Sequence, residues 1–304
     1  MVEFTASHFN DLCNQGPIQS QIQTIEGSRK AALSKFWLYV LGGLGGGLVL
    51  GLIGGSAFNS AVGVVLFIVV LVGVSIFAWL PLAKTSESIK HPVLHSLAAQ
   101  GGMTFVPHGF DPPVFAEAHQ PLFGSWLSSA AFSDLFYGQD PDGHRFAFYE
   151  ATLMRGHGKS RHQVFTGQIY AFQRRRSQQG AVVAVPDRGF FNFWKPSGGF
   201  ERVKFENDPA FEQKFEIYAT DPAEAMLLFG DASTRHLLIQ LRDTGSRVLG
   251  YIGPQDALIA VWGKNRFEPG SMFKSLGGQE RVRLMFDDVC ASLQVLNGLR
   301  GLFS

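Results

Sequence analysis

The sequence has little cysteine and almost no excess charge of either sign. Its two cysteines, Cys13 and Cys290, lie far apart and outside any C-x-x-C spacing. No disulfide framework is therefore expected, which fits a reducing compartment. The 26 basic and 25 acidic residues leave a formal net charge of +1. Such a balance creates no overall positive field, so nucleic acid is not an expected partner.

Charge is also missing from two long apolar runs, residues 36–55 and 61–80. Each run is long enough to cross a hydrocarbon layer of about 30 Å as an α-helix. Residues 56–60 between them have room for a tight turn and nothing larger. The sequence therefore predicts a transmembrane helical hairpin over residues 35–81, with both chain ends on the same side of the membrane.

Basic residues flank the hairpin on that side. Arg29, Lys30 and Lys35 precede the first run, Lys84 and Lys90 follow the second, and the turn between the runs has no charge. Cytoplasmic segments beside membrane helices are enriched in Lys and Arg. We therefore expect a multi-pass membrane protein with both termini in the cytoplasm.

Four glycines in the first run, Gly43, Gly47, Gly51 and Gly55, recur at every fourth position. This spacing places them along one side of a helix, where a second helix can approach closely. Two interpretations remain open: the glycine face receives the second run of the same hairpin, or it mediates homo-oligomer assembly. Neither run contains Asp, Glu, Lys, Arg or His, which argues against ion or proton transport by this chain alone.

The remaining chain is predicted to form a cytoplasmic helical segment, residues 1–34, and a cytoplasmic α+β domain, residues 82–304. Pro81 and Pro92 are expected to interrupt a connector after the hairpin. Hydrophobic patterning predicts strands followed by a long C-terminal helix, and it gives no assignment for residues 115–123. The expected strands are residues 103–106, 145–153, 164–172, 181–185, 200–205, 215–219, 248–252 and 258–262.

Two short motifs resemble ligand-binding loops, but each lacks required residues. Residues 156–160 end like a phosphate-binding loop, although Leu153 occupies the position of the first glycine. Residues 138–143 resemble a calcium loop, but Gly138 and Tyr149 stand where oxygen ligands are needed. A hairpin tip and a tight turn are therefore the preferred interpretations, and no cofactor is expected.

Three histidines, His144, His157 and His162, are close in sequence. No cysteine or second carboxylate lies at a matching spacing, so no metal site is predicted. The basic cluster Arg174, Arg175 and Arg176 has two interpretations: a solvated strand end, or a contact with anionic lipid headgroups.

A cluster of carboxylates lies between residues 208 and 224. Paired acid and base groups of a hydrolase would need such carboxylates, but helix capping and surface roles explain them as well. The cluster consists of Asp208, Glu212, Glu216, Asp221 and Glu224.

A set of dispersed motifs carries a family resemblance. The motifs are Phe165-x-Gly167, Pro186–Asp187, the stretch at 208–225 that contains Phe211–Glu212-x-x-Phe215–Glu216–Ile217–Tyr218–Ala219–Thr220–Asp221, then Phe267–Glu268–Pro269 and Phe273 with Ser275–Leu276. With the preceding hairpin, the chain over about residues 1–300 resembles the bacterial membrane protein family catalogued as domain of unknown function 3137. The resemblance implies the bacterial inner membrane, no assigned activity and no catalytic residues. It also implies a LemA-type membrane protein as a partner.

These observations favour a non-enzymatic, membrane-anchored cytoplasmic interaction or scaffold protein in a homo- or hetero-oligomeric complex. Its expected partners are membrane lipid and another protein or a second copy. One alternative is a membrane-tethered hydrolase that uses the carboxylates at 208–224. Another is a lipid-binding module of pleckstrin-like shape, with residues 174–176 facing the membrane.

Overall fold

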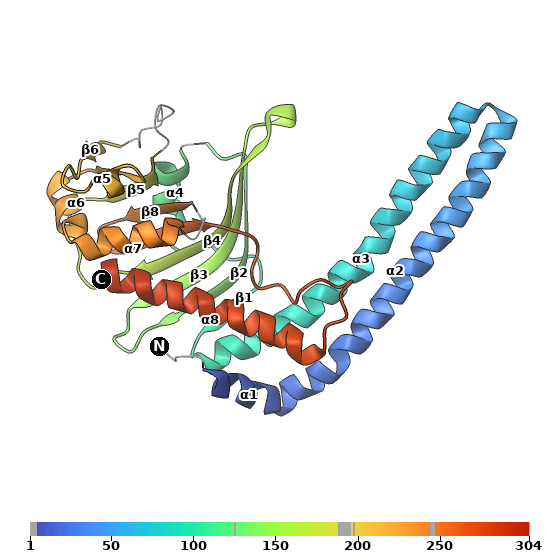
Figure 1. Ribbon diagram of the computed structural model, residues 1–304, viewed down its shortest axis with the longest axis horizontal. Helices are drawn as coiled ribbons and strands as arrows, with labels where there is room; N and C mark the ends of the chain where they lie inside the picture. The colour runs from blue at the N-terminus through green and yellow to red at the C-terminus, as the bar shows by residue number, and fades with distance from the viewer. Residues whose placement is uncertain (1–4, 125, 188–195, 197, 244–246, 304) are drawn as a thin grey trace. The chain divides into compact units, whose positions relative to one another are not determined.

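The computed structural model describes residues 5–303 except 125, 188–195, 197 and 244–246 (Figure 1). The chain divides into two compact units. One is helical and contains Phe4–Leu97 with Phe267–Asp288; the other contains Ala98–Arg266 with Val289–Ser304. The boundaries predicted from the sequence, after residues 34 and 81, separate membrane-spanning from cytoplasmic segments. They therefore stay a prediction.

The helical unit begins with α1 (Ala6–Asn14) and is dominated by two long helices, α2 (Gly16–Ala57) and α3 (Ser60–Gln100). Pro17 follows the first residue of α2, where its fixed φ angle suits a helix start. The side chain of Asn59 accepts a hydrogen bond from the Val62 N–H at 3.0 Å and so caps the start of α3. The two helices are thus joined by the short turn that the sequence predicts.

The connector expected at Pro81 and Pro92 is not formed, because both prolines lie inside α3. A proline inside a helix costs one hydrogen bond and about 3 kcal/mol. The Pro81 carbonyl accepts a hydrogen bond from the Thr85 hydroxyl at 2.8 Å. Around the prolines, α3 buries Leu82 and Val93 almost completely. We attribute the continuity of α3 to this apolar burial, which periodicity around a proline does not reveal.

The first turns of α2 carry an apolar stripe that lies inside the helical unit. Ile18, Ile25 and Ala32 are buried at spacings of seven residues, as a stripe facing one side of a helix requires. From α1, the Phe9 ring meets Phe286 of α8 (Gly278–Phe303) with ring centroids 5.3 Å apart. This apolar stripe before the hairpin therefore contributes to a helical core.

Over its described residues, the second unit is built on an antiparallel sheet of nine strands in the order β1-β2-β3-β4-β9-β8-β5-β7-β6. The predicted α+β class is confirmed. The strands are β1 (Thr104–Val106), β2 (Ser129–Gln139), β3 (Arg145–Arg155), β4 (His162–Gln173), β5 (Val182–Pro186), β6 (Glu201–Val203), β7 (Phe215–Ala219), β8 (Val248–Ile252) and β9 (Asp256–Trp262). The helices are α4 (Phe115–Phe123), α5 (Pro209–Glu212), α6 (Pro222–Phe229), α7 (Ala232–Asp243) and the end of α8.

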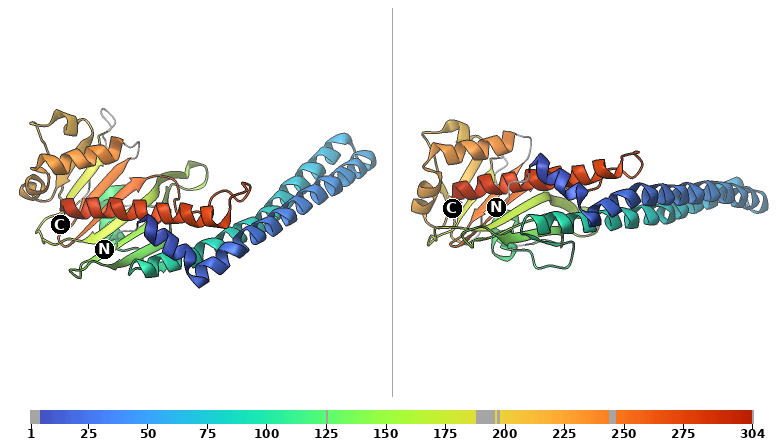
Figure 2. Two further views of the ribbon diagram at one scale, coloured as in Figure 1. Left: turned by 60° about the horizontal axis from the view of Figure 1, so that its bottom comes forward. Right: turned by 90° about the horizontal axis from the view of Figure 1, so that it is seen from below.

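Both faces of this sheet are buried. On one face, Tyr149 and Leu153 of β3 join Phe115 and Leu122 of α4 in a hydrophobic core. Ser292 of α8 is within hydrogen-bonding distance of Gln168 of β4 on the other face, and two views show the C-terminal part of α8, from Val289 on, lying along the sheet (Figures 1 and 2). Because both faces are covered, consecutive residues of β3 and β4 are buried, including the polar Glu150 and Gln168.

Strand β2 was not predicted. Its alternation is interrupted by a register shift between Ser133 and Phe136, and Asp134 between them has a φ of 56°. A bulge of this kind adds a residue to one strand and shifts the side-chain pattern. The period-two signal is therefore lost within β2.

The sheet keeps two edge strands, β1 and β6, over the residues described. The resulting order is linear, without a pairing that closes the sheet into a barrel. The pleckstrin-like shape considered from the sequence is therefore not the observed architecture.

Candidate functional site

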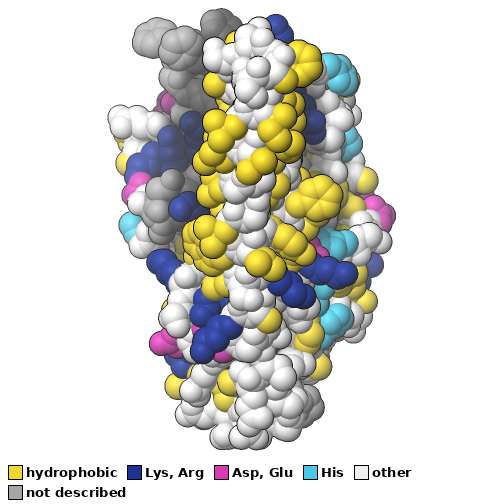
Figure 3. Space-filling model, turned by 90° about the vertical axis from the view of Figure 1, so that its right-hand side faces the viewer, with side chains coloured by type: hydrophobic (Ala, Val, Ile, Leu, Met, Phe, Trp, Pro, Cys, Tyr) yellow, Lys and Arg dark blue, Asp and Glu magenta, His cyan; other side chains and the backbone are white. Residues whose placement is uncertain are grey.

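The two long helices are exposed and apolar. The best windows within Ile18–Ala57 and Ser60–Gln100 have mean hydropathies of 1.9 and 3.0, and only 11% of each window is buried. Leu38, Leu52 and Phe77, for example, expose between 66% and 71% of their surface. A helix of a soluble core would bury such residues. This hydrophobic surface (Figure 3) indicates association with a membrane.

One glycine face of α2 lies against α3. A Cβ at Gly47 would come within 3.3 Å of the Phe67 ring, and one at Gly51 would come within 3.1 Å of the Gly63 carbonyl oxygen. A Cβ at Gly43 would overlap Val74. Close approach of the two helices therefore depends on the missing side chains, although the energy it contributes in lipid stays a prediction.

Gly55, the fourth predicted packing residue, lies at the end of this face. The nearest atom to its Cβ position on another residue is the Cα of Ser60, at 3.9 Å. Gly54, which the spacing argument did not select, is more crowded, because its Cβ would overlap Leu66.

A second glycine face remains uncovered. Cβ atoms at Gly42 and Gly46 of α2 and at Gly73 of α3 would meet no atom within 4 Å. These three glycines line an apolar groove of about 990 Å³, together with Leu50 and Phe77. The sequence contains a signal for this face, a Gly-x-x-x-Gly spacing at residues 42 and 46, but the longer series Gly43, Gly47, Gly51 and Gly55 predicts packing on the neighbouring face instead.

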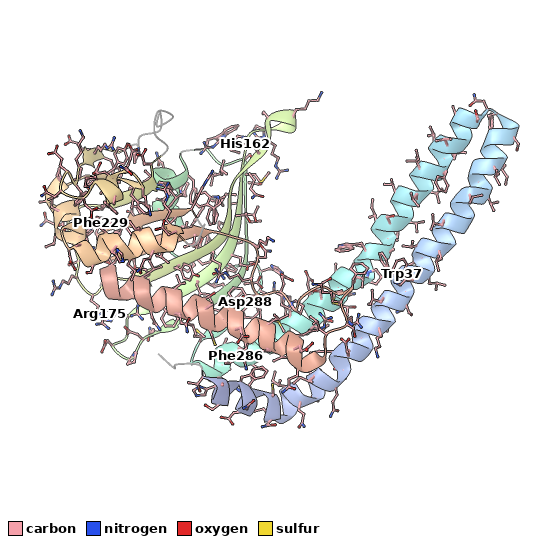
Figure 4. The ribbon with its side chains drawn as sticks, viewed as in Figure 1. Trp37, His162, Arg175, Phe229, Phe286 and Asp288 are labelled. Atoms are coloured by element: carbon pink, nitrogen blue, oxygen red, sulfur yellow. The ribbon has the colours of Figure 1, made fainter. Side chains whose placement is uncertain are left out.

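Aromatic and basic side chains mark one end of the apolar helices. Trp37, labelled in Figure 4, and Trp79 expose 52% and 55% of their surface. Lys35 and Lys84 are exposed within a few residues of them. Trp at the level of the headgroups, followed by Lys on the cytoplasmic side, is typical of a membrane boundary.

The arginine cluster at 174–176 does not act as one surface. Arg174 is buried, and its guanidinium donates hydrogen bonds to the carbonyls of Phe303 at 3.1 Å and Gly253 at 3.2 Å. This corrects its expected lipid contact, because its donors hold the C-terminal end of α8 to the sheet. Arg175 is exposed, as Figure 4 shows, and pairs with Asp142 at 3.0 Å; Arg176 is exposed.

Two of the carboxylates at 208–224 begin helices. Asp208 accepts a hydrogen bond from the Phe211 N–H at 3.1 Å, and Asp221 accepts one from Ala223 at 2.9 Å. The Arg235 guanidinium, 2.7 Å from Asp208, holds the pKa of that carboxyl below its usual value. Both groups therefore have the capping role that the sequence left open.

The other three carboxylates also have structural partners. Glu212 accepts a hydrogen bond from the Phe205 N–H at 2.6 Å, and Glu224 accepts one from the Gln179 N–H at 3.2 Å. Glu216 is buried and paired with Arg202 at 2.7 Å. A pocket of about 340 Å³ is lined by Asp208 and by none of the other four. A paired acid and base, which a hydrolase needs, is not assembled by these carboxylates.

One acidic group resembles a metal site. Ligand atoms of Asp140, Asp142 and His144 lie within 4.8 Å of one another. Guanidinium groups already approach them: Arg300 donates to Asp140, and Arg175 to Asp142. Burial opposes ionisation of Asp140, but the hydrogen bonds and charges of Arg300 and His144 together lower its pKa to about 2. Arginine thus supplies the positive charge that these carboxylates need.

The histidines do not converge. His144 precedes β3 and His162 begins β4, opposite Arg155 at the far end of β3. His157 packs against Trp126 with ring centroids 5.0 Å apart. Residues 156–160 form the tip of the β3–β4 hairpin, with a short 3₁₀ turn at Gly158–Ser160, as predicted.

A buried polar group between the sheet and α8 was missed from the sequence. Gln168 donates to Ser292 at 3.1 Å and accepts from the Tyr170 hydroxyl at 2.6 Å. Glu150, on the neighbouring strand, accepts a hydrogen bond from the Arg266 N–H. Burial raises the pKa of Tyr170 to about 12. The residues of this group come from segments far apart in sequence, so no local sequence pattern predicts that they meet.

The fold and the exposed helices define a membrane-associated α+β protein. Residues 163–300 match the family model described as protein of unknown function (DUF3137), which confirms the resemblance over β4 to α8. No curated protein matches the sequence. A crystal structure of the mycobacterial trehalose monomycolate transport factor A, TtfA, is similar over 67% of this chain and 93% of that one. The identity is 12% and the TM-score 0.34, too low to support a functional argument.

Proposed function

We propose that this protein is a membrane-anchored interaction module that assembles with itself or with another membrane protein. In this proposal the hairpin crosses the bacterial inner membrane twice, and both termini and the α+β unit are cytoplasmic. The exposed Lys35 and Lys84 support this orientation, because Lys and Arg beside membrane helices are enriched on the cytoplasmic side.

The groove at Gly42, Gly46 and Gly73 carries the proposal. The neighbouring glycine face is already used by the hairpin, since Gly43 and Gly47 lie against α3. An additional helix would therefore have to pack on the uncovered glycines. Small residues there let two backbones approach closely, which is what stabilises helix pairs in lipid.

The carboxylates support an interaction function over a hydrolytic one. Capping accounts for Asp208 and Asp221, and Glu216 and Glu212 share an ion pair with Arg202. General acid–base hydrolysis needs one group that donates a proton to the substrate and one that accepts a proton. Carboxylates held in helix caps and ion pairs do not serve that role.

Two matched variants test the groove. The double variant Gly42→Leu and Gly46→Leu fills it, whereas Gly45→Leu adds the same side chain where nothing lies within 4 Å and outside the groove lining. Each protein is extracted in mild detergent, and its mass is measured by native mass spectrometry together with any co-purifying protein. A LemA-type membrane protein is the first candidate in that fraction.

We expect the natural chain and Gly45→Leu to keep the same assembly and the double variant to lose it. A lone natural monomer with no partner contradicts the proposal, and so does equal loss of assembly in both variants. Tags on the two termini test the orientation separately: both should be accessible only from the cytoplasmic side.

A further inference from the structure

The segment between β9 and α8 places an aromatic side chain beside the base of the hairpin. Phe273 is 46% exposed. Its ring centroid lies 5.3 Å from that of Phe36 on α2 and 6.2 Å from that of Trp79 on α3. We call residues 267–277 the Phe273 loop. It thus contacts both membrane helices within the helical unit.

Buried polar groups hold this loop in place. Arg281 of α8 donates to the carbonyls of Pro269 at 2.7 Å and Lys274 at 2.8 Å, and its side chain is fully buried. Arg29 of α2 donates to the Met272 carbonyl at 3.1 Å. Buried charged donors that each bind backbone carbonyls fix the loop conformation.

An ion pair anchors the start of the loop to the third helix. Lys90 of α3 lies 2.8 Å from Glu268, and the Lys90 side chain is buried. Phe273 therefore lies on a segment whose position is fixed by contacts with α2, α3 and α8.

The position of Phe273 coincides with the boundary of the apolar helices. Phe36 is the first residue of one uncharged run, and Trp79 is the next-to-last residue of the other. Exposed Lys35, Lys84 and Lys274 lie next to these aromatic residues in sequence or within a few positions of them. An aromatic layer bordered by lysines matches the headgroup level of a bilayer.

We propose that the Phe273 loop is a third membrane-contacting element, inserting Phe273 into the bilayer interface while Lys274 binds the phosphate of anionic lipid headgroups. Lipid is the occupant because the ring neighbours of Phe273 belong to the ends of the apolar helices, which lipid surrounds. The inference rests on membrane insertion of the hairpin in the proposed function, but it does not depend on assembly at the groove.

Depth measurement tests the insertion. A Phe273→Cys variant, with Cys13→Ala and Cys290→Ser, is labelled with an environment-sensitive fluorophore and reconstituted into bilayers of phosphatidylethanolamine and phosphatidylglycerol. A Leu48→Cys variant in the same background is the control, because Leu48 lies near the middle of the first run and is 56% exposed. Lipids with quenchers at two depths then locate each fluorophore.

We expect the label at 273 to emit at shorter wavelength than in water and to be quenched more by the shallow quencher. The label at 48 should be quenched more by the deep one. Water-like emission at 273, with normal deep quenching at 48, overturns the loop proposal alone. Loss of lipid quenching at both positions instead overturns membrane insertion, and with it the proposed function.

A charge variant tests the headgroup contact. Each lysine near an anionic surface strengthens binding about five-fold. We therefore expect Lys274→Gln to reduce co-purified phosphatidylglycerol relative to phosphatidylethanolamine by about that factor. Lys159→Gln removes the same charge from the exposed hairpin tip and should have little effect. Equal losses in the two variants, or no loss in either, contradict a local phosphate site at Lys274.

Discussion

Gly63 of α3 lies so close to Gly51 of α2 that a Cβ on Gly63 would overlap the Gly51 carbonyl oxygen. We expect Gly63→Ala to push the helices apart and to destabilise the hairpin by about 1–3 kcal/mol, the usual cost of overpacking. Denaturation in detergent micelles, followed by tryptophan fluorescence, measures this loss. Gly73→Ala is the matched control on the same helix, because its Cβ would meet no atom within 4 Å. Equal stability of the two variants would mean that close helix contact contributes little.

Arg281 is buried, and we expect its loss to lower the stability of the helical unit strongly. Arg281→Met leaves the Pro269 and Lys274 carbonyls without their charged donor, so we expect a loss of about 3 kcal/mol. Arg283→Met changes an exposed neighbour that pairs with Asp287 and should cost less than about 1 kcal/mol. Chemical denaturation of the two variants under the same conditions compares these costs. A smaller loss for Arg281→Met than for Arg283→Met would contradict the role of Arg281 in holding the Phe273 loop.

Gly167 in β4, part of the family motif, has a φ of 148°, and a Cβ there would overlap the Val261 carbonyl oxygen in β9. We expect Gly167→Ala to cost at least about 2 kcal/mol, because it combines a strained backbone with displacement of a paired strand. Gly263→Ala, beside the same strand pair, meets no atom within 4 Å and should be nearly neutral. Thermal unfolding separates the variants, and equal melting temperatures would refute the steric argument.

Asp140 predicts a pH dependence of stability. Its pKa of about 2 is below the value of about 3.9 for an aspartate in an unfolded chain. The folded state therefore favours the charged carboxylate, whose stabilising effect is complete above about pH 4 and is lost as the pH falls toward 2. We expect the melting temperature of the natural chain to fall across this window.

An Asp140→Asn variant provides the comparison. It should melt at a lower temperature at neutral pH, because the ion pair with Arg300 is lost, and it should show a shallower decline on acidification. Thermal scans between pH 6 and pH 2 measure both slopes. Parallel slopes would show that other carboxylates dominate the acid response.

Local pattern in the sequence predicts most elements of the fold. The C-terminal helix, for example, keeps Val282, Val289 and Leu296 at spacings of seven residues, and all three are buried. Strand β2 and the continuity of α3 were missed for opposite reasons. In β2, the bulge at Asp134 interrupts the alternation of apolar and polar side chains that would predict a strand. In α3, burial of apolar residues around Pro92 keeps the helix continuous where the proline predicts its end.

The candidate site was predictable only in part, because most of its features depend on which segments meet. The spacing of Gly43 and Gly47 predicts a helix-packing face, but it does not say whether that face meets α3 or another molecule. Likewise, three consecutive arginines look alike in sequence, although Arg174 alone is buried against Phe303, 129 positions away.

The sequence by itself determined the two apolar runs, their basic flanks and the alternating strands, since each depends on residues close together in the chain. Only the tertiary structure decided that Gly42 and Gly46 stay uncovered and that Arg281 holds the Phe273 loop. The physical reason is that burial and pairing of a side chain depend on distant segments, whose contacts form only when the whole chain has folded.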